Sequence, residues 1–389
     1  MIILSNDNKG NIPGDTAVIT GGTARFARDF SERVIASGHG WVGVFQDTED
    51  CAYNSTLNNL GYFGIGTRRG ITTDFLTLNV EIDPYIYFKP EIDAVIARIE
   101  ENNVDVIFIN GAWVFTWILY AAAKIKNIPY VVQHAGIFVV EMQYFTFETS
   151  EIGRQMCKKM ISGIAKDAKA NIFLNAFDQE QFTKTTTSDI ANPVIIPLPY
   201  GDGLFPQEIV AKQSTPIQIG CVARWDPIKN HVGLLEFARE VNTQKLPWVI
   251  SCVTTIPDTQ MKIDFKNAYR ENIRVVPPMN RVELLDFYRS MNLMILPSHF
   301  DISPTVVLEA LSVGVPTVIS PNVGWVSEYI EAGMSEWIID FGNPKESIEK
   351  IELLLEGKDW SEVSVLSQKV TVSHESSHIF TRYLELFTQ

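Results

Sequence analysis

Short segments that are apolar at every position alternate with helical stretches along almost the whole chain, and this alternation constrains the fold more than any other feature. Strands of this kind are buried on both faces, which is typical of parallel sheets covered by helices. The sequence therefore predicts an α/β protein with doubly wound sheets. The expected strands are Met1–Ser5, Trp41–Phe45, Val106–Ile109, Tyr130–Gln133, Ala170–Leu174, Val194–Pro197, Ile217–Val222, Trp248–Val253, Ile273–Val276, Leu293–Leu296, Thr317–Ser320 and Trp337–Ile339.

The number of expected strands points to two domains. Twelve strands are more than one twisted open sheet usually contains, and 389 residues correspond to two or three domains at roughly 100–200 residues each. Residues 196–207, IPLPYGDGLFPQ, are rich in proline and glycine and lack periodicity, which indicates a break. We expect Rossmann-like domains over residues 1–204 and 205–372, facing each other across a cleft, and a C-terminal helix over about 373–389 that packs back on the first domain.

The net charge of the chain limits the kinds of ligand that it can bind. The chain has 46 acidic and 32 basic side chains, a formal net charge of −14. Such a body repels a phosphate backbone, so we expect no nucleic-acid partner. A small anionic ligand is still compatible with it, because a few local cations or backbone N–H groups can hold one.

The compartment is inferred from the cysteines and the N-terminus. The four cysteines are far apart and form no CxxC pair, which favours a reducing cytoplasm. The sequence MIILSNDNKG has no basic region before its apolar residues, so we expect no signal peptide. Val106–Ala123 is almost long enough to span a membrane, but a buried strand followed by a core helix explains it better.

Two segments carry candidate ligand-binding groups. Arg224 and Lys229 follow the strand Ile217–Val222 and lie next to a helix expected over Asn230–Glu240, a pattern that suits adjacent phosphates. After the strand Leu293–Leu296, Asp301 precedes a helix expected to start near Thr305, which puts Glu309 in its second turn. Carboxylates accept hydrogen bonds from sugar hydroxyls, and N–H groups at the start of a helix can face a ligand oxygen. The residues at this start are Ser303, Pro304, Thr305 and Val306.

Taken together, Arg224-x4-Lys229 and Asp301-x7-Glu309, followed by Gly314-Val315-Pro316, resemble the donor-binding half of family-4 glycosyltransferases, which have the GT-B fold. TGGTARFARDFSERVIASGHGWVGVF resembles the family's Gly-Gly loop and long helix, and IPYVVQHAG resembles its histidine-bearing loop. The chain departs from the family in having Asp301 where Glu is usual, and in lacking glycine in the loop VTTIPDT.

The resemblance implies a retaining hexosyltransferase that moves a hexose-type sugar from a UDP- or GDP-linked donor to a glycan or lipid-linked acceptor, in polysaccharide or glycoconjugate synthesis. It implies that Arg224 and Lys229 neutralise the diphosphate. Asp301, with the backbone of residues 303–306, would hold the donor sugar, and Glu309 would hold the ribose.

The resemblance also assigns residues in the first domain. The backbone of Gly21 and Gly22 would close over the phosphates, and His134 would lie beside the sugar. No general base is evident, which suits a same-face mechanism in which the leaving phosphate takes the acceptor's proton. Because the chain contains no DxD sequence, we expect no metal and no cofactor besides the nucleotide-sugar substrate.

Other motifs support alternatives. VITGGTARFA, Asp47 and Tyr120-x3-Lys124 resemble short-chain NAD(P)-dependent oxidoreductases, although the third glycine of G-x-G-x-x-G is missing. A non-catalytic protein that binds nucleotide sugars is a second alternative. HESSH, from His374 to His378, matches a zinc-protease motif; only 11 residues follow it, so we interpret it as part of an exposed terminal helix.

The acceptor side is less constrained. Aromatic residues in Gly136–Phe147 could stack on a sugar ring, and core packing explains them equally well. The helix expected around Arg154–Lys169 carries five basic side chains that suit either a solvated face or peripheral contact with anionic lipid at the inner face of a membrane. They are Arg154, Lys158, Lys159, Lys166 and Lys169.

Overall fold

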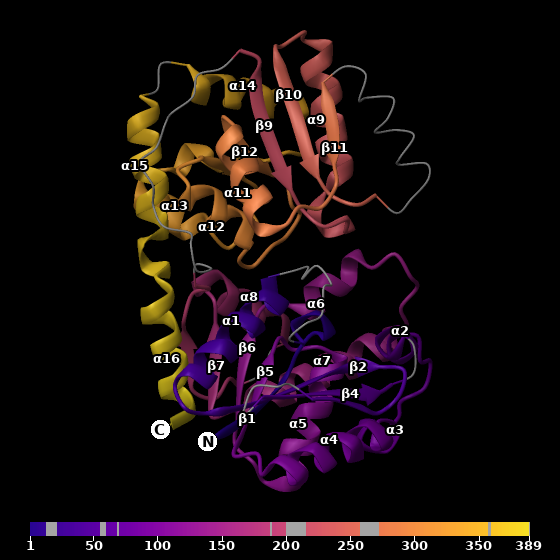
Figure 1. The fold of residues 1–389 in the computed structure, drawn as a ribbon. Coiled ribbons are helices and arrows are strands. Elements are labelled where there is room, and N and C mark those ends of the chain that lie inside the picture. The colour runs from indigo at the N-terminus through magenta and orange to yellow at the C-terminus, as the bar shows by residue number, and fades with distance from the viewer. Residues whose placement is uncertain are drawn as a thin grey trace. The chain divides into compact units, whose positions relative to one another are not determined.

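The computed structural model describes residues 1–12, 22–54, 60–67, 70–186, 189–199, 215–256, 272–356 and 359–388. The chain divides into two compact units, one formed by Met1–Pro199 with Ser377–Gln389 and the other by Tyr200–Ser376 (Figure 1). The domain boundary expected at residues 204–205 lies outside the described residues, as does Gly21.

The first unit contains a doubly wound sheet. Among the described residues it has eight strands in the order β3-β4-β2-β1-β5-β6-β7-β8. All neighbouring pairs are parallel except β3 and β4, which are antiparallel. From β1 the chain winds outwards in one direction to β2 and β4 and in the other to β5 and the later strands. The strands are β1 (Ile2–Asn6), β2 (Gly40–Asp47), β3 (Cys51–Asn54), β4 (Leu60–Gly66), β5 (Val106–Asn110), β6 (Tyr130–His134), β7 (Ala170–Phe173) and β8 (Pro193–Ile195).

Right-handed crossovers distribute the helices of this unit unequally. The crossover from β1 to β2 runs opposite to those that follow β4, so its helix, α1, lies on one face, and the helices of these later crossovers cover the other. On that second face, α4 packs against α5, and α5 against α7. The helices are α1 (Gly22–Ala36), α2 (Ile71–Leu76), α3 (Pro84–Tyr87), α4 (Lys89–Asn102), α5 (Val114–Lys126), α6 (Phe138–Glu141), α7 (Glu151–Lys166) and α8 (Ala176–Thr186).

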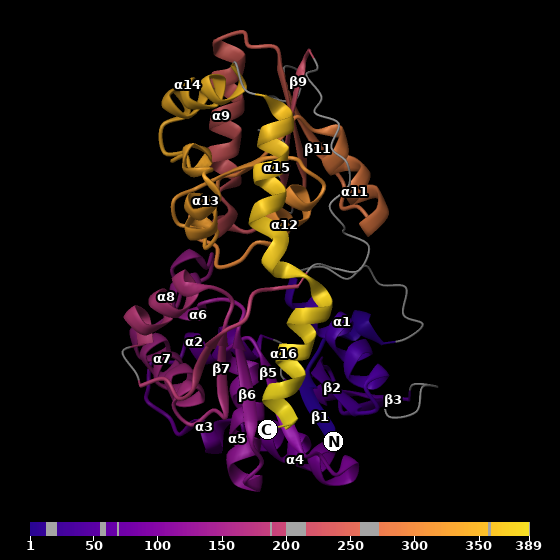
Figure 2. The same ribbon diagram turned by 90° about the vertical axis from the view of Figure 1, so that its left-hand side faces the viewer.

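The C-terminal helix α16 (Ser376–Thr388) completes the face that α1 begins (Figure 2). The ring of Phe380 stacks on that of Phe30 at a centroid distance of 5.8 Å. Phe387 meets Phe108 of β5 edge-on at 5.5 Å. All four rings are buried, and aromatic contacts of this kind contribute about 0.5–1.5 kcal/mol each beyond the area they bury. The last helix is therefore part of the first unit's core.

A chain of buried hydrogen bonds fixes α16 to the centre of the sheet. The Tyr383 hydroxyl donates to Oε1 of Gln133 at 2.6 Å, and Nε2 of Gln133 donates to Oδ1 of Asn110 at 3.2 Å. Asn6 completes the chain: its Oδ1 accepts from the Asn110 backbone N–H, and its Nδ2 donates to the Asn110 carbonyl, both at 2.8 Å. The chain of bonds therefore runs from the C-terminal helix to the carboxyl ends of β1 and β5.

The second unit has a five-stranded parallel sheet among its described residues, in the order β11-β10-β9-β12-β13. Helix α9 packs against α14, and α12 against α15. The strands are β9 (Ile217–Val222), β10 (Trp248–Val253), β11 (Ile273–Val276), β12 (Leu293–Leu296) and β13 (Thr317–Ile319). The helices are α9 (His231–Thr243), α11 (Arg281–Ser290), α12 (Thr305–Ser312), α13 (Val326–Ala332), α14 (Pro344–Leu355) and α15 (Trp360–Thr371), with a 3-10 turn, η3, at Pro227–Lys229.

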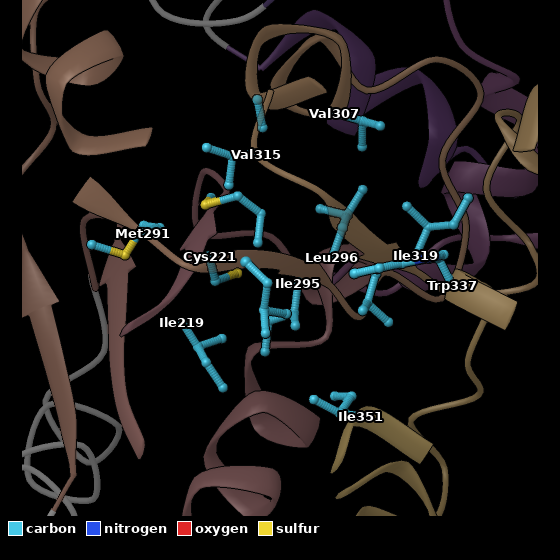
Figure 3. Close-up of a cluster of buried hydrophobic side chains, with 14 of the residues drawn as sticks. Ile219, Cys221, Met291, Ile295, Leu296, Val307, Val315, Ile319, Trp337 and Ile351 are labelled. Atoms are coloured by element: carbon cyan, nitrogen blue, oxygen red, sulfur yellow. The ribbon is translucent and has the colours of Figure 1, made fainter. Parts of the chain in front are cut away.

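The core of this unit joins the strands to the helices on both sides of the sheet (Figure 3). Ile219 and Ile295 are 0% and 1% exposed and come from the adjacent strands β9 and β12. Between these strands, Gly220 is required for packing, because a Cβ there would lie 2.3 Å from Sδ of Met294. Close approach at this position brings together the two strands from which the sheet winds in opposite directions.

The predicted α/β architecture with doubly wound parallel sheets is confirmed, with two differences in the strands. Trp337–Ile339 is not a strand: Ser335–Trp337 is a 3-10 turn, and Ile338 makes only an isolated bridge to Ile319. Trp337 and Ile339 are each 1% exposed, so core packing explains their apolar pattern. The strands β3 and β4 were not predicted, because LGYFGIG contains three glycines, which are depleted in strands.

Replacing Tyr383 by Phe tests the buried hydrogen-bond chain. The ring and its aromatic contacts remain, but Gln133 Oε1 loses its donor inside the core, so the free energy of unfolding should fall by about 1–3 kcal/mol. Urea denaturation measures the change. The control is Thr381→Val, which removes an exposed hydroxyl from the same helix and should change stability by less than about 0.5 kcal/mol. Equal stabilities for Tyr383→Phe and the wild type would contradict a structural role for this chain of bonds.

Candidate functional site

The candidate site lies at the carboxyl edge of the second unit's sheet, where the loops after β9 and β12 emerge side by side. Ligands of doubly wound sheets bind at such switch points. The loop after β9 forms η3 and then turns into α9 at Asn230, which has a left-handed backbone (φ 55°). The Asn230 side chain accepts from the Gly233 N–H at 3.0 Å and so caps α9. Asparagine tolerates both the left-handed conformation and the cap position, which fixes the turn locally.

Three contacts join the two loops. The His299 N–H donates to the carbonyl of Ile228 at 2.8 Å. Nδ2 of Asn230 donates to the carbonyl of Pro297 at 3.1 Å. The third contact is an ion pair between Nζ of Lys229 and Oδ2 of Asp301. Two candidate residues that are 72 positions apart are therefore brought together.

The Lys229–Asp301 pair is well shielded and held in place. The exposed fractions of the two side chains are 17% and 13%. The backbone of Asp301 is fixed by the loop after β13, since its N–H donates to Asn322 O at 3.2 Å and its carbonyl accepts from Gly324 N at 2.8 Å. A cation in such a partly dry position interacts more strongly with a phosphate oxygen than one in bulk water.

Arg224 lies on the same loop but does not contact this pair. Its side chain is 70% exposed and approaches Asp226 Oδ2 at 3.7 Å. Asp226 in turn caps η3 by accepting from the Ile228 N–H at 3.1 Å. Arg224 therefore provides a second cation whose long side chain extends into solvent.

Glu309 is held from a neighbouring helix. Helix α12 starts at Thr305, as expected, so Glu309 lies in its second turn, and its exposed fraction is 6%. Oε2 of Glu309 accepts a hydrogen bond at 2.8 Å from the hydroxyl of Tyr288, a fully buried residue of α11. The carboxylate is therefore fixed in orientation.

The start of α12 lies in the same loop as Asp301. The N-cap residue is Pro304, and no side chain caps the helix there. The first N–H groups of an α-helix have no acceptor within the helix, and together with the helix dipole they favour an anion or a sugar oxygen nearby. Ser303, Thr305 and Val306 are half-buried at this point.

His134 belongs to the first unit and is completely buried. Its Nε2 donates to Asn171 Oδ1 at 2.9 Å, because the Asn171 amide nitrogen is already bonded to two backbone carbonyls. The ring stacks on Phe173 at 4.6 Å and contacts Phe182 at 4.2 Å. Burial lowers the pKa of His134 to about 4, and the bond to Asn171 opposes this shift.

Gly22, the other described candidate residue of the first unit, is the first residue of α1.

Residues 206–368 match the family described as glycosyl transferases group 1. Arg224, Lys229, Asp301 and Glu309 all lie within the matched residues. Among similar proteins is D-inositol 3-phosphate glycosyltransferase 1 of Catenulispora acidiphila, 31% identical over 100 residues, or 26% of this chain and 24% of that protein. A D-inositol 3-phosphate glycosyltransferase of Thermobispora bispora is 31% identical over 87 residues, 22% and 20%. The matches thus span about a quarter or less of these relatives.

Solved structures match the entire chain. Sucrose-phosphate synthase from Thermosynechococcus elongatus aligns with 100% of this chain and 99% of its own, with a TM-score of 0.79 at 15% identity. A glycosyltransferase from Rickettsia africae covers 100% and 97%, with a TM-score of 0.68 at 13% identity. These likenesses establish that the fold is GT-B. The residues that match glycosyl transferases group 1 lie within its second unit.

The oxidoreductase motif is accounted for by core packing. Tyr120 is 9% exposed in α5 and packs against Tyr130 at 5.5 Å. Lys124 is in the last turn of α5, towards the amino edge of the sheet, and pairs with Asp167 at 3.0 Å. A dinucleotide would bind at the opposite, carboxyl edge.

The HESSH segment does not form one exposed helix, so that interpretation was wrong. His374 ends a 3-10 turn, Glu375 is extended, and α16 starts at Ser376. His374 is 3% exposed, and its ring packs on Trp325 at 4.8 Å. The two histidines are therefore not on one helical turn. Within the described ranges, no three His, Cys, Asp or Glu side chains gather as a metal ion would need.

Two segments were considered for contact with a membrane, Val106–Ala123 and the basic helix α7. Val106–Ala123 forms β5 and most of α5, and no helix in the described part of the chain is long and apolar enough to cross a bilayer. On α7, Arg154 pairs with Glu151 at 2.6 Å and Lys159 with Glu81 at 2.8 Å. These two cations are therefore partly neutralised.

The residues that position the site were not predicted from the sequence. Asn230, Tyr288 and His299 act through hydrogen bonds to residues far away in the chain or through a left-handed turn. The one signal that could have indicated Asn230 is its position directly before a helix, where asparagine is a preferred cap. No local signal indicates that Tyr288 bonds Glu309.

The burial of His134 predicts how stability depends on pH. Its pKa is about 4 in the folded chain and about 6.5 when unfolded. The unfolded chain therefore binds the extra proton first, and stability that is complete above pH 6.5 is lost as the pH falls towards 4. This group accounts for about 3 kcal/mol. In His134→Gln, urea denaturation at a series of pH values should lack this component.

The control for this prediction is His378→Gln, which changes an exposed histidine of α16. It should leave the pH dependence of the wild type unchanged. If His134→Gln and the wild type lost stability in parallel between pH 6.5 and 4, the histidine would not be the group responsible.

Proposed function

We propose that this chain is a retaining, metal-independent glycosyltransferase that moves a hexose-type sugar from a nucleoside diphosphate donor to a glycan or lipid-linked acceptor. The observation that carries the proposal is the convergence of Lys229 and Asp301 at the switch point of the glycosyl transferases group 1 domain. A shielded cation for the diphosphate and a carboxylate for sugar hydroxyls are thereby placed together at the edge where such sheets bind ligands.

Donor recognition follows from the chemistry of each group. Lys229, with its charge near Asp301, neutralises one part of the diphosphate, and Arg224 reaches from solvent to the other with its planar guanidinium. Asp301 accepts hydrogen bonds from the sugar hydroxyls, and the N–H groups of Ser303, Thr305 and Val306 donate to sugar oxygens. Glu309, oriented by Tyr288, accepts from the ribose hydroxyls. In the first unit, we propose that the backbone of Gly21 and Gly22 approaches the phosphates. His134 is completely buried between Phe173 and Phe182, so its expected place beside the sugar would require the ring to become exposed.

The proposed reaction needs charge stabilisation more than a protein base. The bond between the anomeric carbon and the diphosphate oxygen breaks, and its electron pair goes to the diphosphate. The acceptor oxygen bonds to the same face of the sugar, and its proton passes to the leaving phosphate oxygen. Lys229 and Arg224 stabilise the charge on the leaving group, which preorganised cations do efficiently. Nucleotide sugar is the only small molecule that this scheme requires besides the acceptor.

The acceptor and compartment are proposed more broadly. Both similar proteins are named for transfer to an inositol phosphate, and sucrose-phosphate synthase is named for a sugar phosphate product. For this chain we propose a different class of acceptor, a glycan or a lipid-linked sugar, bound on the first unit. The half-buried rings of Phe138 and Phe145, 5.5 Å apart after β6, support a sugar-binding role there. A cytoplasmic location, with or without peripheral contact at the inner membrane face, agrees with the four free cysteines.

The Lys229→Ala variant tests the diphosphate assignment. Removing a charge-assisted contact of about 1.5–3 kcal/mol should weaken nucleoside diphosphate binding roughly 10- to 100-fold, and transfer should be lost. Calorimetric titration with UDP and GDP, followed by a panel of their sugar conjugates, measures binding and identifies the base.

The matched control is Lys350→Ala on α14, which removes a lysine paired on the surface with Glu346. It should bind nucleotide and transfer sugar like the wild type. Unchanged transfer in Lys229→Ala would contradict the assignment. Wild-type protein that bound nucleotide sugars without any transfer would favour the non-catalytic alternative, and tight NADH binding without nucleotide-sugar binding would favour the oxidoreductase.

Metal independence has its own test. Turnover should be the same in EDTA as in Mg²⁺ or Mn²⁺, because Lys229 and Arg224 supply the positive charge. Loss of turnover in EDTA that is restored by either metal would contradict the proposed mechanism.

A further inference from the structure

A second concave site lies in the first unit, at the carboxyl ends of β2 and β4. It is a cavity of about 780 Å³, within the size range of small-molecule sites. The loop after β2, the end of β4, the end of α3 and the beginning of α4 contribute to its wall. The lining residues are Thr48, Asp50, Gly66, Thr67, Ile86, Tyr87, Pro90 and Glu91.

The wall of this cavity is held in shape by backbone hydrogen bonds. Oδ1 of Asp50 accepts from the Gly66 N–H at 2.7 Å, and the Thr67 N–H donates to the carbonyl of Asp47 at 2.9 Å. These bonds tie the loop after β2 to the end of β4. Because a carboxylate has two oxygens, Asp50 retains acceptor capacity beyond its bond to Gly66.

Glu91 is the unusual residue in this wall. It is 5% exposed in the first turn of α4, and its Oε2 is buried without a hydrogen-bond partner among the described residues. A buried polar atom without a partner is costly, and such atoms are rare in native structures. A ligand that donates a hydrogen bond here would remove the cost.

The chemistry of the wall selects one kind of ligand. Among the described residues that line the cavity, the charged ones, Asp50 and Glu91, are both acidic, and these two carboxylates disfavour a phosphate. The hydroxyls of Thr48 and Thr67 add polar contacts, while Ile86 and Pro90 provide apolar surface. Carboxylates and hydroxyls beside apolar surface match a neutral sugar ring, whose hydroxyls donate and whose C–H face is apolar.

We propose that this cavity binds a neutral, phosphate-free sugar ring of the acceptor; the assignment to the acceptor rests on the proposed function. The cavity lies two strands from the β1–β5 switch point, which is roughly 10 Å at about 4.8 Å per strand. It is therefore a subsite for a neighbouring sugar of a glycan. A chain with this subsite accepts a glycan in preference to an isolated sugar phosphate.

Saturation-transfer NMR on the full chain tests the subsite directly, using the methyl α-pyranosides of glucose, mannose and galactose as probes. We expect saturable binding of at least one glycoside in the wild type, and binding of glucose 6-phosphate at least 10-fold weaker. In Glu91→Leu the affinity should fall roughly 10-fold or more. The melting temperature should not fall, because an unpartnered buried carboxylate has been replaced by an apolar side chain of similar size.

Two variants complete the design. Asp50→Asn keeps an oxygen for the Gly66 N–H, so the loop stays in place, but sugar affinity should fall several-fold with the lost charge. Glu101→Leu, an exposed position of the same helix, should bind the glycoside like the wild type. If Glu91→Leu fails to fold, Asp50→Asn carries the test.

Three results would overturn the subsite: no saturable binding of any of the three glycosides, unchanged affinity in both cavity variants, or tighter binding of the sugar phosphate. Titration of UDP and GDP separates this outcome from failure of the proposed function. Nucleotide binding should be the same in wild type, Glu91→Leu and Asp50→Asn. Glycoside binding that depends on Glu91, in a chain that binds no nucleotide, would leave the subsite standing and remove the donor assignment.

Discussion

The handedness of the strand crossovers is the constraint on which the first unit depends. Because the crossover from β1 to β2 runs opposite to those that follow β4, α1 covers its face of the sheet without another crossover helix beside it among the described residues. Strands such as β5, whose residues are buried on both faces, need a covering layer on each side of the sheet. The chain solves this with α16, whose Phe380 and Phe387 complete the core, and whose Tyr383 bonds Gln133. The final helix is thus a structural consequence of the sheet topology.

The same winding creates the places where function is possible. At each switch point two loops leave the sheet side by side, and their backbone groups need partners. In the second unit the loops satisfy one another: His299 bonds Ile228, and Lys229 pairs with Asp301. In the first unit, the side-chain amide of Asn6 bonds both the backbone N–H and the carbonyl of Asn110. In an acidic body of net charge −14, the proposed binding of a diphosphate would therefore depend on local geometry and not on long-range attraction.

The sequence predicted the fold wherever a pattern is local. β9, β10, β11 and β12 have the predicted bounds, because apolar runs bounded by loops mark buried strands. Trp337–Ile339 has the same composition but packs as a turn, since burial alone does not decide between strand and loop. In the site, residue types and spacing identified Lys229 and Asp301, but their contact depends on tertiary structure. Tyr288 has no such pattern, because its role exists only where α11 meets α12.

Two buried glutamates differ in whether their carboxylate receives a hydrogen bond from the protein. Glu309 and Glu91 are 6% and 5% exposed, so both have lost most of their contact with water. Glu309 receives a hydrogen bond from Tyr288, and this bond holds its carboxylate in one orientation. Oε2 of Glu91 has no such donor among the described residues, and its desolvation is uncompensated within the protein. Since proteins tolerate local instability chiefly where function requires it, the second pattern marks a surface that a hydroxyl-bearing ligand completes.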